Sequence, residues 1–158
     1  MRVEGVQFAA AHFATFGGSS EPLHGHSYEV AAELDGALSE ESWVIDFIEL
    51  KSILRSLCDE LDHRFLLQTE SRILELEPGA TTWRIRSPSG MEYTLPASDV
   101  VALPIDNTTA ERLAEWLCGR LGEKLSERGA HKVETITVEV WEGRGQRASH
   151  RQQRLPVD

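Results

Sequence analysis

The sequence predicts an α+β domain in which two helices pack on one face of an antiparallel sheet. Segments with apolar residues at every second position, which is typical of strands, alternate with segments whose apolar residues recur at the helical spacing. These segments follow one another as strand, strand, helix, hairpin, helix and strand. We expect from this order an antiparallel four-stranded sheet with both helices on one face, plus an inserted hairpin.

The first two strands carry histidines at one end. In the first, Val6, Phe8 and Ala10 share one face with His12. A turn-rich stretch, residues 16–22, leads to the second strand. There one face carries His24, His26, Tyr28, Val30, Ala32 and Leu34. The two strands therefore form a sheet with imidazoles at one end and apolar residues beyond them.

The first helix has the strongest local signals. Asp46 is a suitable N-cap, and Glu49 follows at the capping-box spacing. The apolar residues at helical spacing are Phe47, Leu50, Ile53, Leu54, Leu57 and Leu61. The helix is expected to end near Asp62 and His63.

A hairpin is expected after this helix, over residues 81–86 and 91–95, with a Ser-Pro-Ser-Gly turn. The second helix begins at Thr108 or Thr109 and ends at Gly129. The final strand has Ile136, Val138, Val140 and Glu142 on one face. Beyond it lies a basic cluster, for which a solvated tail and a phosphate site are both open: Arg144, Arg147, His150, Arg151 and Arg154.

Length and composition limit the classes of function. A chain of 158 residues suits a single domain, which we predict over 1–158. A net charge of −10 argues against nucleic-acid binding. No stretch approaches the ~20 apolar residues of a membrane span, and the first residues are too polar for a secretory signal. We therefore expect a cytoplasmic protein with no membrane or nucleic-acid partner. Free thiols are expected at Cys58 and Cys118.

Three histidines suggest a metal site. His24 and His26 lie two residues apart on one face, and His12 lies in phase on the neighbouring strand. Gly25 between them allows the backbone to approach another chain segment closely. An isolated His-x-His pair is more often a surface or core feature. Three neutral imidazoles with an open fourth position, however, are typical of catalytic zinc. The sequence therefore predicts Zn²⁺ bound by His12, His24 and His26.

Two further groups are ambiguous from the residues alone. The carboxylate of Asp62 can fix the tautomer of the adjacent His63, as in catalytic acid–base pairs, or the two residues can simply end a helix. Glu142 either emerges into solvent at a strand end or points into a site. In a site, its carboxylate can accept two parallel N–H bonds from a guanidine-like edge.

The chain as a whole resembles the family of 6-pyruvoyl-tetrahydropterin synthases and 6-carboxy-tetrahydropterin synthases. The motifs that carry the resemblance occur in the family's order: AAHF, LHGHSY, VIDFIELK, LDHR, NTTAERLA and VEVWEG. The resemblance implies a tunnelling fold (T-fold) and a homo-hexamer built as a dimer of trimers with active sites between subunits. It also implies 7,8-dihydroneopterin triphosphate as substrate.

The resemblance assigns roles by position. His12, His24 and His26 match the zinc ligands, and Asp62 and His63 match two members of the catalytic triad. Glu142 matches the residue that anchors the pterin, and the pair Thr108 and Thr109 matches threonines that lie near it.

One departure from the family pattern bears on the reaction. Ser20 stands where the usual members have a catalytic cysteine, and a serine hydroxyl is a far weaker acid than a thiol. Glu21 follows it, as in the third type of the family, whose members cleave the substrate's side chain to form 6-hydroxymethyl-7,8-dihydropterin, a folate precursor. The resemblance therefore implies Glu21 as the catalytic base, although a solvated loop acid is the alternative.

Three hypotheses about function follow. The first is a zinc-dependent lyase that uses Glu21 to form 6-hydroxymethyl-7,8-dihydropterin. The second is 6-pyruvoyl- or 6-carboxy-tetrahydropterin synthase activity through another group. The third is a pterin-binding homologue without turnover. The segment 68–101 is longer than a minimal member of the family needs, and the sequence assigns it no role.

Overall fold

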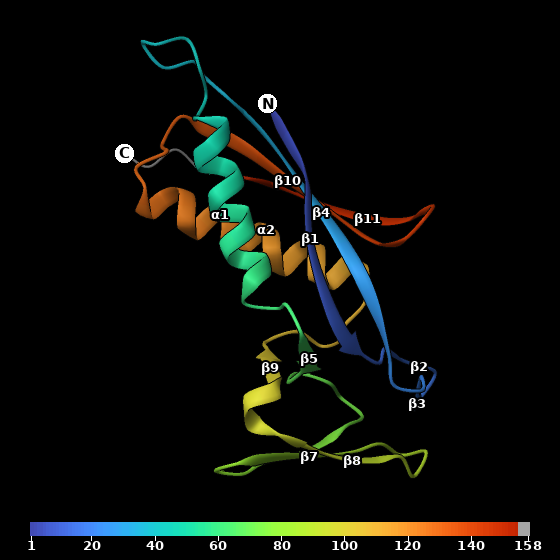
Figure 1. Cartoon of the computed structure of the whole chain (residues 1–158). Helices are drawn as coiled ribbons and strands as arrows, with labels where there is room; N and C mark the ends of the chain where they lie inside the picture. The colour runs from blue at the N-terminus through green and yellow to red at the C-terminus, as the bar shows by residue number, and fades with distance from the viewer. Residues whose placement is uncertain (155–158) are drawn as a thin grey trace.

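The computed structural model describes residues 1–154 and confirms the α+β class (Figure 1). The helices and longer strands are β1 (Arg2–His12), β4 (His24–Gly36), α1 (Phe47–Asp59), β5 (Arg64–Gln68), α2 (Ala110–Glu127), β10 (Val133–Gly143) and β11 (Gln146–Gln153). The shorter elements are β2 (Thr15–Phe16), β3 (Ser19–Ser20), β6 (Glu75–Pro78), β7 (Thr82–Arg86), β8 (Glu92–Pro96), η1 (Ala97–Asp99) and β9 (Val100–Leu103).

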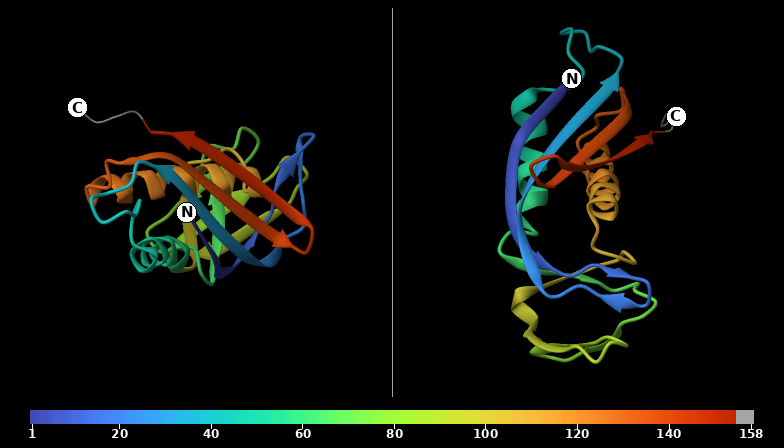
Figure 2. Two further views of the ribbon diagram at one scale, coloured as in Figure 1. Left: turned by 90° about the horizontal axis from the view of Figure 1, so that it is seen from above. Right: turned by 90° about the vertical axis from the view of Figure 1, so that its right-hand side faces the viewer.

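The main sheet is larger than the sequence predicted. Within residues 1–154 it has six strands in the order β11-β10-β4-β1-β5-β9. Strands β11, β10, β4 and β1 form an antiparallel set of four, of which β11 was not among the predicted strands, and β5 and β9 extend it as parallel strands. The long strands β1 and β4 bend along their length, as the right-hand view of Figure 2 shows.

Strand β11 is the main element that the sequence did not predict. Its sequence, QRASHRQQ, offers only Ala148 to the core, and a strand with so few apolar residues resembles a polar tail. It forms because β10 supplies an antiparallel partner over residues 135–143. Charged and polar side chains are also common on the edge strand of a sheet.

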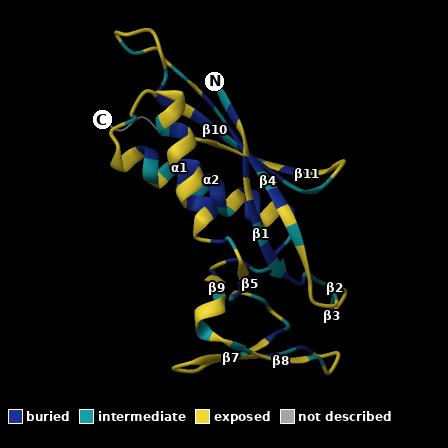
Figure 3. Cartoon of the chain, viewed as in Figure 1, coloured by how far each residue is buried: buried dark blue, intermediate teal, exposed yellow. Residues whose placement is uncertain are grey.

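Both helices cover one face of the main sheet. Helix α1 packs on β1, α2 packs on β10 and β11, and the helices contact each other. The shared core contains Phe8, Val30, Leu34, Leu50, Leu54, Leu57, Leu113, Leu117, Leu121, Ile136 and Val138. Figure 3 shows exposed residues along the outer sides of the helices, as expected for amphipathic helices on a sheet. Within residues 1–154, no helix combines the length and hydrophobicity that crossing a bilayer requires.

The N-terminal boundaries of both helices follow the predicted caps, whereas α1 ends at Asp59, before the expected end near Asp62 and His63. The Asp46 carboxylate accepts the N–H groups of Ile48 (2.5 Å) and Glu49 (3.2 Å). Thr109 caps α2 by accepting the N–H of Arg112 at 3.4 Å. Phe47 differs from the expectation, because it is 59% exposed in the first turn of α1, and Leu50 is the first core residue of this helix.

The inserted segment forms a small sheet of its own. The predicted hairpin is present as β7 and β8, and β6 adds a third strand. This sheet lies beyond β5 and β9, away from the helices (Figure 1). It packs on a second apolar cluster, made by Phe13, Phe65, Leu67, Leu74 and Ile85. Figure 3 marks much of β7 as exposed, so only one side of this sheet is buried.

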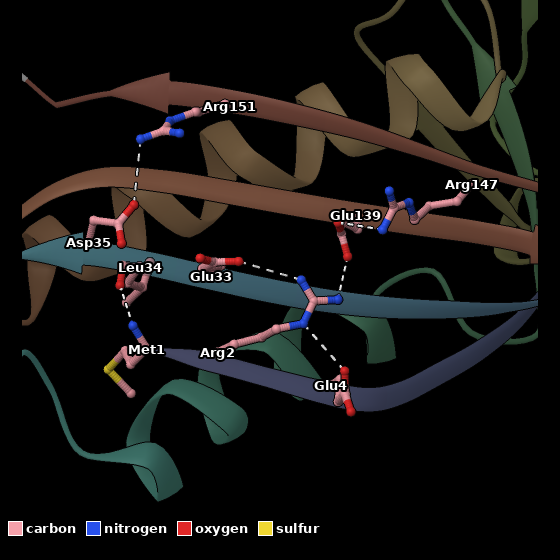
Figure 4. Close-up of polar contacts among 9 residues, drawn as sticks. All are labelled: Met1, Arg2, Glu4, Glu33, Leu34, Asp35, Glu139, Arg147 and Arg151. Carbon is pink, nitrogen blue, oxygen red and sulfur yellow. Dashed lines mark hydrogen bonds and ion pairs between the residues drawn. The ribbon is translucent and has the colours of Figure 1, made fainter.

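The face of the main sheet opposite the helices is polar. There Arg2 on β1 forms ion pairs with Glu33 on β4 and with the nearly buried Glu139 on β10 (Figure 4). Glu139 also accepts a hydrogen bond from Arg147 on β11 at 2.9 Å. The network thus ties together the four antiparallel strands.

Similar contacts hold three residues of the C-terminal basic cluster in place. Arg147 pairs with Glu139, and Arg151 lies 3.5 Å from the Asp35 carboxylate (Figure 4). Arg154 donates to the carbonyl of Ala130 at 2.7 Å. Arg147 and Arg151 on β11 therefore pair with carboxylates of neighbouring strands, and Arg154 is held by a backbone carbonyl, so these three side chains do not form a free tail.

Candidate active site

The three histidines come together where β1 and β4 end. His12 lies directly opposite His24 in the strand register, and Ala10 lies opposite His26. Each ring offers one nitrogen, and these nitrogens all lie within 4.8 Å of one another. A Cβ at position 25 would lie 3.0 Å from the carbonyl oxygen of Ala10, so Gly25 allows the close strand approach that the sequence suggested.

The donor atoms suit a divalent metal. Nδ1 of His12 lies 2.9 Å from the carbonyl oxygen of Thr108, and Nδ1 of His24 lies 2.9 Å from that of Pro22. A carbonyl oxygen only accepts, so each Nδ1 carries the proton and each Nε2 keeps a lone pair. Nε2 of His12 is buried and has no hydrogen-bond partner within residues 1–154. A buried lone pair without a donor is costly unless it binds a cation.

Burial keeps the His12 ring neutral. Desolvation lowers the pKa of His12 to about 4, and repulsion from His24 contributes in the same direction. Metal ligation needs the neutral imidazole. The phenol ring of Tyr28 lies beneath the cluster, with its centroid 6.0 Å from that of His12 and 5.5 Å from that of His26.

A cavity of about 560 Å³ opens over the three histidines. Among the residues that line it are Glu21, Thr109, Glu111 and Glu142. Its size is in the usual range for small-molecule sites. Burial raises the pKa of the Glu142 carboxyl, and the charges of Glu111 and Glu21 raise it further. A carboxylate of this kind has an unmet demand for hydrogen-bond donors that a ligand can satisfy.

Glu21 lines the cavity, and two hydrogen bonds with the backbone of Ala14 hold it there. Its N–H donates to the carbonyl of Ala14 at 2.9 Å, and its Oε2 accepts the N–H of Ala14 at 3.3 Å. Ser20 precedes it in β3, and its hydroxyl oxygen is buried without a hydrogen-bond partner in the described chain. Ser20 is not among the residues that line the cavity.

Thr108 and Thr109 have different surroundings. Thr109 caps α2 and lines the cavity, as a residue near a bound ligand must. Thr108 is fully buried, and its hydroxyl donates to the carbonyl of Phe13 at 3.0 Å. The structure therefore brings Thr109 to the cavity and places Thr108 behind it.

Asp62 and His63 form the expected pair, but away from this cavity. The Asp62 carboxylate accepts the N–H of Ala9 at 2.7 Å and lies 2.8 Å from Nδ1 of His63. These two contacts, the Ala9 bond first, hold the pKa of Asp62 below its ordinary value. The His63 side chain is 83% exposed and lines a second cavity, of about 550 Å³, with Gly25 and Asp99, and His26 borders both cavities.

The backbone of His63 has a positive φ, and its side chain is exposed. Its φ is +56°, a left-handed conformation that is unfavourable for a residue with a side chain. The N–H of His63 donates to the carbonyl of Ala9 at 2.6 Å, which stabilises this turn. Strain of this kind is common at functional sites.

Comparisons with known proteins agree with these features. The chain matches the family model described as 6-pyruvoyl tetrahydropterin synthase over residues 2–153. A Methanocaldococcus jannaschii relative is 34% identical over 148 residues, which cover 93% of this chain and 90% of the relative. The 6-carboxy-5,6,7,8-tetrahydropterin synthase of Aquifex aeolicus is 30% identical, and the match covers 83% of this chain and 75% of the Aquifex aeolicus protein.

A solved structure of a Plasmodium vivax 6-pyruvoyltetrahydropterin synthase superposes with a TM-score of 0.91 at 31% identity. The match covers 98% of this chain and 97% of the Plasmodium vivax chain. That protein is a variant in which a catalytic glutamate is replaced by alanine. A more distant relative, the dihydroneopterin monophosphate aldolase of Pyrococcus furiosus, is 25% identical. The match covers 78% of this chain and 73% of the aldolase.

Proposed function

Because this chain belongs to the 6-pyruvoyl tetrahydropterin synthase family, and is therefore an enzyme of that family, we propose that it cleaves the side chain of 7,8-dihydroneopterin triphosphate. The product is 6-hydroxymethyl-7,8-dihydropterin. One observation supports this reaction over the others of the family: Glu21, and not Ser20, lines the cavity over the histidines.

The relatives support a glutamate in this role. The Plasmodium vivax synthase has a catalytic glutamate, and the Pyrococcus furiosus relative is named as an aldolase. An aldolase reaction needs a base to remove a hydroxyl proton, and a carboxylate can supply it. A serine hydroxyl is too weakly acidic to replace the family's cysteine without a further base.

We propose that His12, His24 and His26 hold Zn²⁺, which leaves the fourth position for the substrate. The lone pair of His12 and the Nδ1–H tautomers of His12 and His24 fit this ion. When bound, zinc supplies Lewis acidity that lowers the pKa of the substrate's side-chain hydroxyls.

The protein's own groups then account for the proton movements. Glu21 takes the proton of the C2′ hydroxyl, and the C1′–C2′ bond breaks as C2′ becomes the carbonyl of the departing two-carbon aldehyde. The bonding electrons pass into the pterin ring, and a proton returns to C1′. Glu142 accepts two N–H groups of the pterin, and Thr109 lies beside it. Asp62 and His63 serve as the acid pair.

The position of His63 on a different cavity leads us to propose that a neighbouring copy supplies it. The assembly would be a homo-hexamer, a dimer of trimers, in which the edge strands β9 and β11 of adjacent subunits pair. Large apolar side chains are exposed and available for contact with a neighbouring subunit: Phe16, Leu38, Trp43, Phe47 and Ile48.

The experiment that tests the function is one incubation of zinc-loaded protein with dihydroneopterin triphosphate. The expected product, identified by mass, is 6-hydroxymethyl-7,8-dihydropterin. The second candidate is 6-pyruvoyl- or 6-carboxy-tetrahydropterin synthesis, which the name of the Aquifex aeolicus relative favours. A pyruvoyl- or carboxy-pterin would establish that reaction, and pterin binding without any product would indicate a homologue without turnover.

A further inference from the structure

We infer that Gln68 is a positioning residue of the metal site, acting through Thr108 on the ring of His12. The inference rests on one part of the proposed function, that the three histidines hold a metal ion. It assigns a role to Gln68, the last residue of β5, which the sequence patterns did not single out.

Gln68 is a fully buried amide, with 0% of its surface exposed. Its Nε2 donates to the carbonyl of Phe13 at 3.2 Å, and its Oε1 accepts from the hydroxyl of Thr108 at 3.3 Å. A buried amide is costly unless it is hydrogen-bonded, so a glutamine here has to be matched by specific partners. Both partners of Gln68 are next to or in contact with His12.

Thr108 carries the connection to the metal ligand. Its single hydroxyl hydrogen is shared between the carbonyl of Phe13 at 3.0 Å and Oε1 of Gln68 at 3.3 Å. Its own carbonyl accepts the Nδ1–H of His12 at 2.9 Å. This bond sets the tautomer and the direction of the His12 ring, and so directs Nε2 toward the other histidines.

The carbonyl of Phe13 is the point where the network converges. The Gln68 amide and the Thr108 hydroxyl both donate to it, from segments 55 and 95 residues away along the chain. Asn107 reinforces the same loop, because its side chain accepts the N–H of Thr15 at 2.9 Å and donates to its carbonyl at 2.8 Å. The segment that carries His12 is thereby fixed on the side away from the cavity.

The decisive experiment measures metal affinity. Gln68→Met keeps the length of the side chain and removes the amide. We expect the dissociation constant for Zn²⁺, measured by competition with a chromophoric chelator, to rise about 10- to 100-fold, as for other partners of metal-bound histidines. The Co²⁺-loaded variant is expected to show altered visible absorption bands, because these report ligand geometry and not global stability.

Two sets of variants separate positioning from a general loss of stability. Thr108→Val removes the hydroxyl and is expected to weaken Zn²⁺ binding, whereas Thr108→Ser keeps the hydroxyl and is expected to bind as the wild type does. Thr135→Val is the control, since Thr135 is also buried but lies on β10 opposite Asp35, at the other end of β4 from the histidines. It is expected to leave the Zn²⁺ affinity and the Co²⁺ spectrum unchanged.

The outcomes distinguish this inference from the proposal on which it rests. Wild-type protein that fails to bind Zn²⁺ would overturn the metal site itself. Tight binding by the wild type, with the same affinity and Co²⁺ spectrum in Gln68→Met, would overturn only the role of Gln68. If Gln68→Met fails to fold, equal affinities in Thr108→Val and Thr108→Ser would overturn it, as would an equal loss in Thr135→Val.

Discussion

The Oε2 atom of Glu21 lies 4.0 Å from the Nε2 atom of His24, the nitrogen that is free for a metal. The carboxylate holds this position because both the N–H and the side chain of Glu21 bond to the backbone of Ala14. If the three histidines hold a metal ion as proposed, a base in this place would be next to a hydroxyl at the ion's fourth position. The neighbouring Ser20 lacks this access.

The first prediction follows from that contrast. Glu21→Gln keeps an oxygen that can accept the Ala14 N–H, but the amide cannot take up a proton. We expect turnover of dihydroneopterin triphosphate to fall by ~10²–10⁴-fold, the range for loss of a positioned base. Zinc content should stay at the wild-type level. Steady-state kinetics together with metal analysis would measure both.

Ser20→Ala is the matched control for Glu21→Gln and is expected to cost little activity. In the Glu21→Gln background, Ser20→Cys should shift the products towards pyruvoyl- or carboxy-type pterins, since a thiol can supply a thiolate base. An inactive Ser20→Ala beside an active Glu21→Gln would show that the serine carries the reaction.

The second prediction concerns the metal. Replacing His24 or His26 with alanine removes one of three ligands and should abolish stoichiometric zinc. The fold should persist, because the shared core lies further along β1 and β4 and on the helices. Metal analysis and far-UV circular dichroism would test this. Full zinc occupancy in both variants would rule out the assignment.

The third prediction concerns the inserted sheet. Ile85 on β7 is fully buried in the cluster that contains Phe13, the residue after His12. Ile85→Ala should lower the free energy of unfolding by about 2–5 kcal/mol, the usual cost of a cavity in a packed core. Urea denaturation would measure it, with the half-buried Leu76→Ala on β6 as a control that should cost less. Equal, small losses in both variants would mean that the insert packs loosely.

Much of this site was predictable because strand geometry has a simple period. Residues 12, 24 and 26 share a face once two strands pair, and their pairing brings the histidines together. The positions of Gln68 and Ser20 could not be predicted in this way. Whether a side chain points into a cavity or behind it depends on long-range contacts, such as those from Phe13 to residues 68 and 108. Strand β11 was not predicted from the sequence, because it forms through its pairing with β10 and not through apolar residues of its own.

The fourth prediction concerns assembly. His63 lines a different cavity from Glu21 in its own chain, and the proposal that a second copy supplies the acid pair follows from this. We expect a hexamer by light scattering at micromolar concentration. We also expect His63→Ala and Glu21→Gln subunits, each inactive alone, to regain part of the activity when they are mixed and reassembled. A monomer, or mixed subunits that stay inactive, would contradict shared sites.

The last prediction concerns Glu142, whose replacement should weaken pterin binding but stabilise the free protein near neutral pH. If its carboxylate accepts two N–H groups of the pterin, Glu142→Gln removes one partner of a buried charged interaction. Pterin binding should weaken by ~2–5 kcal/mol. Isothermal titration with a dihydropterin would measure this, and unchanged affinity would mean that the pterin binds elsewhere.

The effect on stability has the opposite sign and depends on pH. Burial raises the pKa of Glu142 in the folded protein, so as pH rises the unfolded carboxyl loses its proton first. The folded state then binds more protons, and the free energy of unfolding falls between the unfolded pKa, about 4.3, and the raised folded value. Glutamine does not ionise, so the free energy of unfolding of the variant does not fall for this reason. Without metal or pterin, Glu142→Gln should therefore match the wild type below about pH 4 and be more stable near pH 7. Urea denaturation at both pH values would measure the difference. A variant that is less stable than the wild type near pH 7 would show that the ionised carboxylate already has partners in the free protein, and a pterin anchor would then need another explanation.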